Sequence, residues 1–302
     1  MPHHFLEPSG NVNSIRMEGI NKLKLEVGAI NVNSFNVSTM GNRNSKTELK
    51  IEGITSRKHE ILLISDCRLG AHEDKIKKLM GLNRNCSYKV YFNSNMDSRG
   101  VGIAIKRSVY HEVLETFCSM DQNIILLKIK IKGCVLALGS IYGPNEQKPE
   151  FFFELRQKLE NWGLPYIIGG DFNTILDRSM GIDNKDKEGG GRIPNSRNSE
   201  EIGQWIEHGD CIEPFRALYP EQKETSYIPF RGGRGNNYSK TRLDFFLISR
   251  NIIDIVGKVV YEDRLGKDFD HKMTTIRVGR GGVPQVRLAS TIVHWTIGWQ
   301  TK

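Results

Sequence analysis

A pair of polar side chains follows a short apolar run near the middle of the chain. The run Tyr166–Ile168 leads into two glycines and then into Asp171, Phe172 and Asn173. Because alternate residues of an extended chain point to the same side, Asp171 and Asn173 face one way and Phe172 faces the other. The motif therefore presents an acid and an amide together, which suits a ligand site. It also suits a simple turn at the end of a strand, since Gly, Asp and Asn favour turns.

Other apolar runs also stop at a hydrophilic residue. Taken singly, each such residue has a structural explanation: Asp66 could form a turn, Asn145 could belong to a Pro-Asn turn, and Asp244 could be a satisfied polar residue beside a buried strand. An α/β sheet, however, exposes its ligand sites where its strands end. The recurrence predicts one site at these ends, built from Asn36, Asp66, Tyr142, Asn145, Asp171, Asn173, Asp244, Asp270 and His271.

Short runs rich in Ile, Leu, Val and aromatic residues predict the strands that position these side chains. They are Ala29–Val37, Ile61–Ser65, Lys89–Phe92, Gly100–Ile105, Asn123–Ile131, Cys134–Tyr142, Tyr166–Ile168, Leu243–Ile248 and Met273–Arg277. Lys132 and Gly133 separate two of the runs and predict a hairpin turn. Strands mixed with helices, and hairpins among the strands, indicate an α/β fold with mixed sheets.

Two helices are predicted from apolar residues at helical spacing. The first begins at Pro149, which can occupy a first helical position, and ends at Gly163. The second begins at Asn198 as its N-cap and ends at Gly209. The aromatic residues of both helices are expected to lie in the core.

The composition is that of an ordinary globular protein, with 302 residues, 38% hydrophobic and 26% charged. No stretch approaches the roughly 18 apolar residues of a membrane helix, and the first residues lack the pattern of a signal peptide. The five cysteines are scattered, which predicts reduced intracellular thiols rather than disulfides or a zinc site. The formal net charge of +8 favours a polyanionic partner, nucleic acid before an anionic membrane.

In its motifs the sequence resembles the exonuclease–endonuclease–phosphatase superfamily, and within it the endonuclease domain of LINE-type (non-LTR) retrotransposons. The motifs are Tyr-Gly-Pro-Asn at 142–145, Gly-Gly-Asp-Phe-Asn-Thr at 169–174, Arg-Leu-Asp-Phe-Phe-Leu-Ile at 242–248 and Asp-His at 270–271. The resemblance covers roughly residues 30–277. It implies a DNase I-like fold, a four-layered α/β sandwich of two packed mixed β-sheets flanked by helices.

The same resemblance implies a function. The protein would be a Mg²⁺-dependent endonuclease, with Mn²⁺ as the alternative metal and no small-molecule cofactor. It would hydrolyse a DNA phosphodiester and leave a 3′-hydroxyl. In a retrotransposon such a nick primes reverse transcription.

The resemblance also implies a role for each catalytic residue. Asp171 would accept the proton of the attacking water, and Asn173 would help to hold that water and the phosphate. His271 would contact a nonbridging phosphate oxygen, while Asp244 would fix its tautomer and favour its charged form. Further hydrogen bonds to the phosphate would come from Tyr142 and Asn145.

A divalent-metal site completes the set that the resemblance implies. Its ligands would be Asp66 and Asn36, with Asp270 close by, because Mg²⁺ prefers hard carboxylate and amide oxygens. The chain departs from the family pattern at two positions. Asp66 stands where the family has a glutamate and is one methylene shorter, and Phe269 stands where the family usually has a serine.

These departures leave two alternatives to the favoured enzyme open. One is an abasic-site repair endonuclease of the same superfamily, which would use the same catalytic set and need a pocket for the extruded sugar. The other is a DNA-binding remnant that has lost turnover through Asp66 and Phe269.

A basic segment before Arg242 resembles the hairpin loop that LINE endonucleases insert into a groove of DNA. It predicts contacts with double-stranded DNA through phosphates or a narrow minor groove for the arginines, and through base edges or sugars for the other residues. These residues are Arg231, Arg234, Asn236, Asn237 and Tyr238. Thr225 or Ser226 is expected to donate to the backbone nearby.

One domain is predicted over residues 29–278, between an N-terminal extension over 1–28 and a C-terminal tail over 279–302. No reverse-transcriptase motif is visible, so the chain looks like the endonuclease portion of an element or a truncated copy. A DNA substrate leads us to expect action in the nucleus, without a convincing basic import signal in the sequence.

Overall fold

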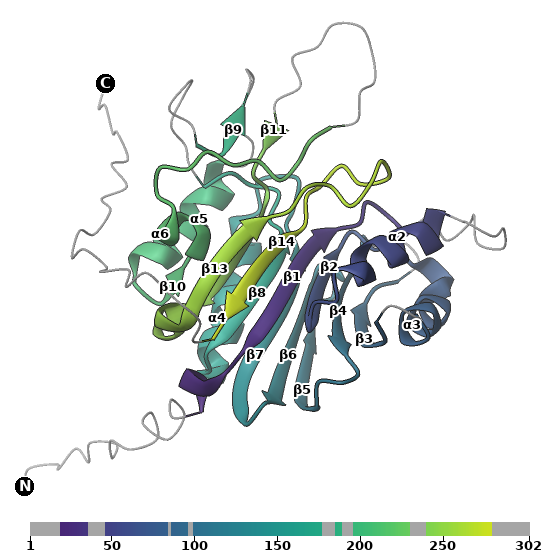
Figure 1. Ribbon diagram of the computed structural model, residues 1–302. Helices are drawn as coiled ribbons and strands as arrows, with labels where there is room; N and C mark the ends of the chain where they lie inside the picture. The colour runs from purple at the N-terminus through teal and green to yellow at the C-terminus, as the bar shows by residue number, and fades with distance from the viewer. Residues whose placement is uncertain are drawn as a thin grey trace, which may run out of the picture.

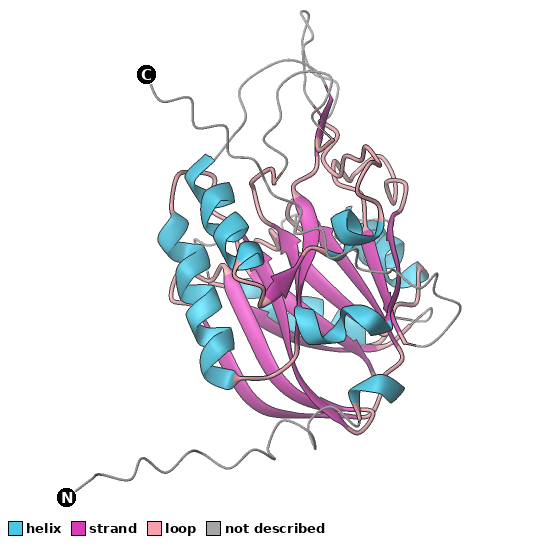
Figure 2. Ribbon diagram, turned by 90° about the vertical axis from the view of Figure 1, so that its left-hand side faces the viewer, coloured by secondary structure: helices cyan, strands magenta, loops and turns pink. Residues whose placement is uncertain are grey.

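The computed structural model describes residues 19–35, 46–83, 86–95, 99–176, 185–188, 196–229 and 240–279. These residues form two six-stranded sheets packed face to face, with helices against the outer faces (Figures 1 and 2). The four-layered α/β sandwich predicted from the sequence is therefore confirmed. No helix within these ranges is long and apolar enough to cross a bilayer.

The first sheet has the strand order β13-β14-β1-β2-β4-β3. Its strands are β1 (Leu25–Asn31), β2 (Ile61–Ser65), β3 (Tyr88–Asn93), β4 (Val101–Lys106), β13 (Val256–Tyr261) and β14 (Thr274–Val278). β1 and β2 run parallel and the other neighbours run antiparallel, so the sheet is mixed.

The second sheet has the order β10-β12-β8-β7-β6-β5. Its strands are β5 (His111–Cys118), β6 (Ile124–Ile131), β7 (Cys134–Tyr142), β8 (Tyr166–Asp171), β10 (Cys211–Ile212) and β12 (Asp244–Ser249). β7 and β8 form its parallel pair. Lys132 and Gly133 both have positive φ and make the predicted turn between β6 and β7.

A two-stranded ribbon projects from the upper edge of the sheets in Figure 1. It pairs β9 (Lys187–Glu188) with β11 (Lys240–Thr241).

Helices close the outer faces of both sheets, and a central apolar layer joins the inner faces. α2 (Lys46–Ser56) and α3 (Glu73–Gly81) pack on the first sheet, and α4 (Pro149–Trp162) and α5 (Ser196–Glu207) pack on the second. The remaining helical segments are α6 (Pro214–Leu218) and the 3₁₀ turns η1 (Ile20–Lys22), η3 (Gly70–His72) and η5 (Arg250–Ile255). Val27, Leu63, Leu138 and Phe246 are among the fully buried residues between the sheets, each contributing about 1.5–3 kcal/mol on burial.

The two predicted helices are present. α4 begins at Pro149 and ends at Gly163, whose φ of 56° lets its N–H bond the carbonyls of Leu159 and Glu160. α5 begins at Ser196, ahead of Asn198. Asn198 does not cap the helix, because its side chain instead bonds the backbone of 146 and 148 and ties α5 to the start of α4.

The first strand differs from its prediction. β1 starts at Leu25 and ends at Asn31, so the boundary predicted after residue 28 falls inside it. Ile20 and Leu23 are already buried in the central layer. Polar residues lie between these apolar ones, so the sequence shows no clear apolar run that would predict the start of the strand. The strands β5 and β13 and the helix α2 were also not predicted, because exposed edges and a weakly amphipathic helix leave little periodic signal. The helix α3 was missed although its apolar residues do follow helical spacing.

Two glycines let β8 pack closely at the end that carries Asp171. A Cβ at Gly169 would lie 2.7 Å from the ring of Phe246. Gly170 has φ +145°, and a Cβ there would lie 2.1 Å from the carbonyl oxygen of Ile141. Glycine is therefore required at both positions for β8 to lie against its neighbours.

A buried ion pair fixes the base of the ribbon. Arg242, fully buried, donates from Nε and Nη2 to both oxygens of Asp186, at 2.7 and 3.1 Å. Its Nη1 lies 3.2 Å from Glu213 and donates to the hydroxyl of Tyr261. These contacts tie β11, α6 and β13 together below the ribbon.

Asp186→Ala should lower the free energy of unfolding by about 3–5 kcal/mol, because it leaves the buried charge of Arg242 without its forked partner. Chemical denaturation measures the loss. Glu188→Ala is the matched control, since it removes the exposed pair with Lys240 between the same two segments. That change should stay within about 1 kcal/mol, and equal losses in the two variants would contradict the anchoring role.

Candidate active site

The ends of four strands bring polar side chains from both sheets together. Asp171, at the end of β8, lies directly opposite Asp244 of β12 and, on its other side, opposite Tyr142 of β7. Asn31, at the end of β1 in the other sheet, donates from Nδ2 to Asp171 Oδ2 at 2.7 Å. A hydrogen bond between buried side chains thus joins the two sheets at the site.

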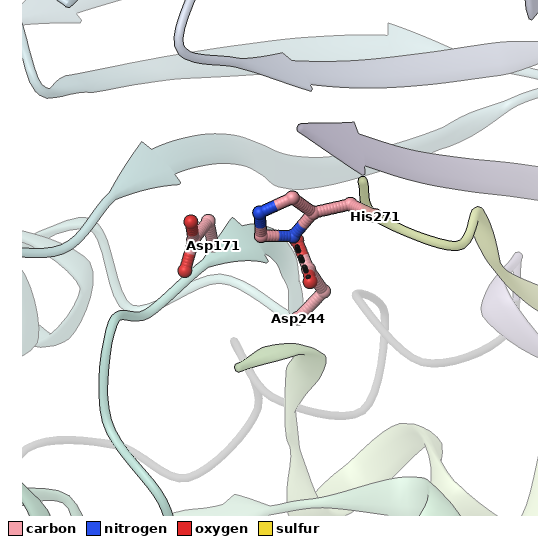
Figure 3. Close-up of side chains that lie close together, drawn as sticks. All are labelled: Asp171, Asp244 and His271. Carbon is pink, nitrogen blue, oxygen red and sulfur yellow. Dashed lines mark hydrogen bonds and ion pairs between the residues drawn. The ribbon is translucent and has the colours of Figure 1, made fainter. Parts of the chain in front are cut away.

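His271 is held against β12 by a short hydrogen bond. Its Nδ1 lies 2.6 Å from Asp244 Oδ2, and both residues are buried (Figure 3). The ring of Tyr227 packs on the imidazole with centroids 5.0 Å apart. Ser226 Oγ accepts the backbone N–H groups of Leu243 and Asp244, each at 2.9 Å. The imidazole and its carboxylate partner are therefore fixed from several directions.

The environment of His271 favours its charged form. Burial alone would lower its pKa, but the charge and hydrogen bond of Asp244, with the charges of Asp171 and Asp270, raise the pKa to about 9. At neutral pH the Nδ1–H therefore donates to Asp244. The ring's second nitrogen lies on the side of Asp171 in Figure 3, and in the charged ring it carries an N–H that can donate.

Asp171 is a buried carboxyl whose two oxygens are both hydrogen-bonded. Oδ1 accepts the backbone N–H of Asn173 at 2.8 Å, and Oδ2 accepts the Asn31 amide. Burial, and then the charge of Asp244, raise its pKa to about 7, although His271 and the hydrogen bonds lower it. Such a group can take up a proton near neutral pH, which a general base requires.

The Asp171-Phe172-Asn173 motif forms the turn that its residue types predict. The bond from the Asn173 N–H to Asp171 closes a turn, and Asn173 has a φ of 50°. Phe172 points the other way, as predicted, and stacks on Phe245 in the outer core with centroids 3.9 Å apart. The turn itself is what orients the carboxylate.

Tyr142, Asn145 and Asn173 lie beside Asp171. Asn145 donates from Nδ2 to the Tyr142 hydroxyl at 3.3 Å, and Asn173 donates from Nδ2 to the carbonyl of Gly143 at 2.7 Å. Burial, and then the charge of Asp171, raise the pKa of Tyr142, so its hydroxyl is neutral and can donate. The structure therefore brings all six predicted catalytic residues to one edge of the second sheet or, for His271, directly against it.

The three residues predicted to bind metal have different surroundings. Asp270 is buried, and its Oδ2 accepts the side-chain amide of Asn33 at 2.9 Å. Asp66 is also buried, but both its oxygens are bonded by Arg68, at 2.7 and 2.9 Å. Asn36 lies outside the described residues.

The buried acids of the site fit a divalent cation. Within the described ranges, Asp244 Oδ1 and Asp270 Oδ1 are buried and have no hydrogen-bond partner, a costly state for a charged oxygen unless a cation compensates it. Asp171, Asp244 and His271 each offer a ligand atom, all within 4.8 Å of one another. Because a protonated imidazole binds no metal, the carboxylates are the ligands that suit Mg²⁺.

Sequence reasoning missed Asn31 and Lys50. Asn31 stands in Asn31-Val32-Asn33, and the alternating amides could have marked it, but the predicted strand ran past it to Val37. Lys50 is buried and donates from Nζ to the carbonyls of Val32, Asn33 and Ser34. It thereby holds the turn that presents Asn31, and nothing in the local sequence of α2 signals this contact.

Most of the predicted DNA contacts fall outside the described residues. These are Arg231, Arg234, Asn236, Asn237 and Tyr238. Thr225 is described; it is 5% exposed, and its backbone N–H bonds the side chain of Glu224. Ser226 uses its hydroxyl oxygen to hold the start of β12, as described above. The predicted groove contacts therefore stay predictions.

The chain is similar in structure to several solved proteins. No protein-family model matches the chain. The endonuclease domain of TRAS1, a telomere-specific non-LTR retrotransposon, is 17% identical with a TM-score of 0.57, over 85% of this chain and 100% of that one. The AP endonuclease LMAP from Leishmania major is 13% identical with a TM-score of 0.62, over 85% of this chain and 88% of that one.

An AP endonuclease from Archaeoglobus fulgidus is 16% identical with a TM-score of 0.62, over 84% of this chain and 99% of that one. At these identities the likeness concerns the fold. Two mixed six-stranded sheets flanked by helices give this chain the DNase I-like fold of these solved structures.

Proposed function

We propose that the protein is a metal-dependent endonuclease that hydrolyses a phosphodiester of DNA. The observation that carries the proposal is the buried Asp171 carboxyl, with a pKa of about 7, beside a His271–Asp244 pair whose imidazole has a pKa of about 9. A base and a fixed cation side by side match the needs of water attack on a phosphate.

Each side chain then has one task. Asp171 takes the proton of the water whose oxygen forms a bond to phosphorus, and the bond from phosphorus to the 3′ oxygen breaks. His271, as imidazolium, donates to a nonbridging oxygen as negative charge builds on it. Tyr142 and Asn145 supply neutral donors to the same group, and Asn173 helps to position the water. The departing 3′ oxygen takes up a proton from solvent, so the products are a 5′-phosphate and a 3′-hydroxyl.

Mg²⁺ is the metal that this donor set suits, with Mn²⁺ as the alternative. Asp270 would hold it through the carboxylate oxygen that has no partner among the described residues. When bound, the metal would stabilise the charge that develops on the phosphate and the departing oxygen.

DNA is the proposed substrate, and target nicking for retrotransposition is the proposed role. The net charge of +8 suits a polyanion, and the likeness to the TRAS1 endonuclease domain supports the retrotransposon assignment. Cleavage at abasic sites is the second candidate, favoured by the higher TM-scores of the two AP endonuclease structures.

Asp171→Asn should slow the nicking of supercoiled plasmid by at least about 100-fold, because the amide cannot accept the water's proton. The assay follows conversion to the open circle with Mg²⁺ present. Asp254→Asn is the matched control, since it makes the same change at an exposed position of η5, at the other end of β12, and should leave the rate unchanged. Full activity of Asp171→Asn would refute the role of Asp171 as the general base. Full activity of the wild type in excess EDTA would refute the metal requirement.

Paired substrates separate the candidate functions. We expect the wild type to cut intact duplex at least as fast as a duplex with one abasic analogue, because target nicking needs no extruded sugar. A strong preference for the abasic duplex, by about tenfold or more, would favour the repair endonuclease instead. Binding of DNA by a wild type that cuts neither duplex would identify a DNA-binding remnant.

The pH profile of kcat/KM should be bell-shaped. Activity should rise as pH passes about 7, where Asp171 loses its proton, and fall as pH passes about 9, where His271 loses its proton. Asp244→Asn should move both limbs to lower pH, because the charge of Asp244 raises both pKa values. An alkaline limb that does not move in this variant would contradict the role given to Asp244.

A further inference from the structure

The turn after β2 gathers two arginines on one buried carboxylate. Arg68 donates from Nε to Asp66 Oδ1 at 2.7 Å and from Nη2 to Oδ2 at 2.9 Å. Arg99 donates from Nη1 to Oδ2 at 3.4 Å. The side chain of Asp66 is 4% exposed, whereas those of Arg68 and Arg99 are 42% and 43% exposed. The acid is the buried anchor, and the arginines face solvent.

Backbone bonds hold this arrangement in a strained turn. Asp66 and Arg68 have φ of 55° and 45°, a left-handed conformation that side chains with a Cβ disfavour. The N–H of Arg68 bonds the carbonyl of Arg99 at 2.7 Å, and the N–H of Ser34 bonds the carbonyl of Asp66 at 2.8 Å. Such strain persists where surrounding contacts demand it, and it is common at functional sites.

The cluster carries positive charge that Asp66 does not cancel. Two guanidinium groups share one carboxylate, so one unit of charge is left over. The fork on Asp66 uses only some of the N–H donors of Arg68, and Arg99 gives a single one. Both arginines therefore keep N–H groups for a further acceptor.

This charge lies at the rim of the candidate active site. The Arg99 guanidinium stands 5.5 Å from the centroid of the Tyr142 ring. Arg68 interacts electrostatically with Tyr142 and Asp270. Tyr142 in turn lies opposite Asp171 in the sheet. The two arginines therefore lie beside the part of the site that Tyr142 forms next to Asp171.

We propose that Asp66 is a positioning residue that holds Arg68 and Arg99 as a phosphate-binding pair for the DNA backbone, and that it is not a metal ligand. The inference rests on the proposed function, since it takes DNA as the substrate. A planar, pre-oriented guanidinium matches the geometry of phosphate oxygens. Arg68 bonds both oxygens of Asp66, so a dication could bind there only by displacing this guanidinium or sharing the oxygens with it. A dication there would also be repelled by two guanidinium charges.

The test measures DNA binding and metal binding separately. A labelled short duplex is titrated in EDTA, followed by fluorescence anisotropy, for the wild type, Arg68→Ala, Arg99→Ala and Asp66→Asn. Arg57→Ala is the matched control, because it removes an exposed arginine at the opposite end of β2. Binding of Mn²⁺ to the DNA-free protein is followed by electron paramagnetic resonance.

Arg68→Ala should weaken duplex binding by about tenfold, as expected for a lost charge-assisted contact. The magnitude of the slope of log binding constant against log salt concentration should also fall by about one. Arg57→Ala should change binding less than about twofold. Asp66→Asn should also weaken DNA binding, although it removes a negative charge, because the arginines lose their anchor. Its Mn²⁺ affinity should stay within about twofold of the wild type.

The opposite pattern overturns the proposal. If Asp66→Asn binds duplex as tightly as the wild type or more tightly, and loses Mn²⁺ affinity about tenfold, then Asp66 is a metal ligand. Arg68→Lys keeps the positive charge without the paired hydrogen bonds to Asp66, and it replaces Arg68→Ala if that variant does not fold. Unchanged DNA binding in Arg68→Lys also counts against Arg68 and Arg99 as a phosphate-binding pair. These readouts do not depend on turnover, so failure of nicking by the wild type rejects the proposed function without deciding the arginine pair.

Discussion

The burial of three carboxylates at the strand ends is the constraint on which the rest of the site depends. Removing a carboxylate from water costs several kcal/mol unless partners replace the lost hydration. Asp244 accepts a hydrogen bond from the imidazolium of His271, and Asp171 accepts hydrogen bonds from a side-chain amide and a backbone N–H. Asp270 accepts one from the Asn33 amide. Because these partners come from both sheets and from the segment before β14, the sheets must pack in one register. Stability and chemistry therefore rest on the same contacts.

These side chains are oriented by turns that contain residues in the left-handed backbone conformation, rather than by the strands themselves. Non-glycine residues with positive φ follow β1 at Asn33 and Ser34, β2 at Asp66 and Arg68, and β8 at Asn173. Each such residue is strained, so each needs a bond that holds it. Lys50 holds the first turn through three carbonyls, and burial lowers the pKa of its ammonium. Rigid strands thus end in turns whose conformation is set by tertiary contacts.

This division explains what the sequence could predict. The strands around Asp171 and Asp244, the hairpin at Lys132 and the helix from Pro149 follow from local patterns, and the polar residues at those strand ends were predicted to lie together, as they do. Asn31 was missed because the end of β1 depends on its pairing with β2 and β14, which no local pattern records. The paired hydrogen bonds from Arg68 to Asp66 could not be predicted from the sequence either, because they depend on a strained turn. Where tertiary contacts decide a conformation, sequence periodicity carries no information about it.

The two departures from the family pattern have partners in this structure, which bears on whether the site has decayed. The shorter side chain of Asp66 keeps its carboxylate close to β2, where both oxygens are bonded by Arg68. Phe269 is 2% exposed, packs in the outer core of the first sheet, and lies 5.6 Å from the ammonium of Lys50, which holds the Asn31 turn. Both residues are therefore built into the packing around the site, Asp66 through its paired hydrogen bonds with Arg68 and Phe269 through its contact with Lys50.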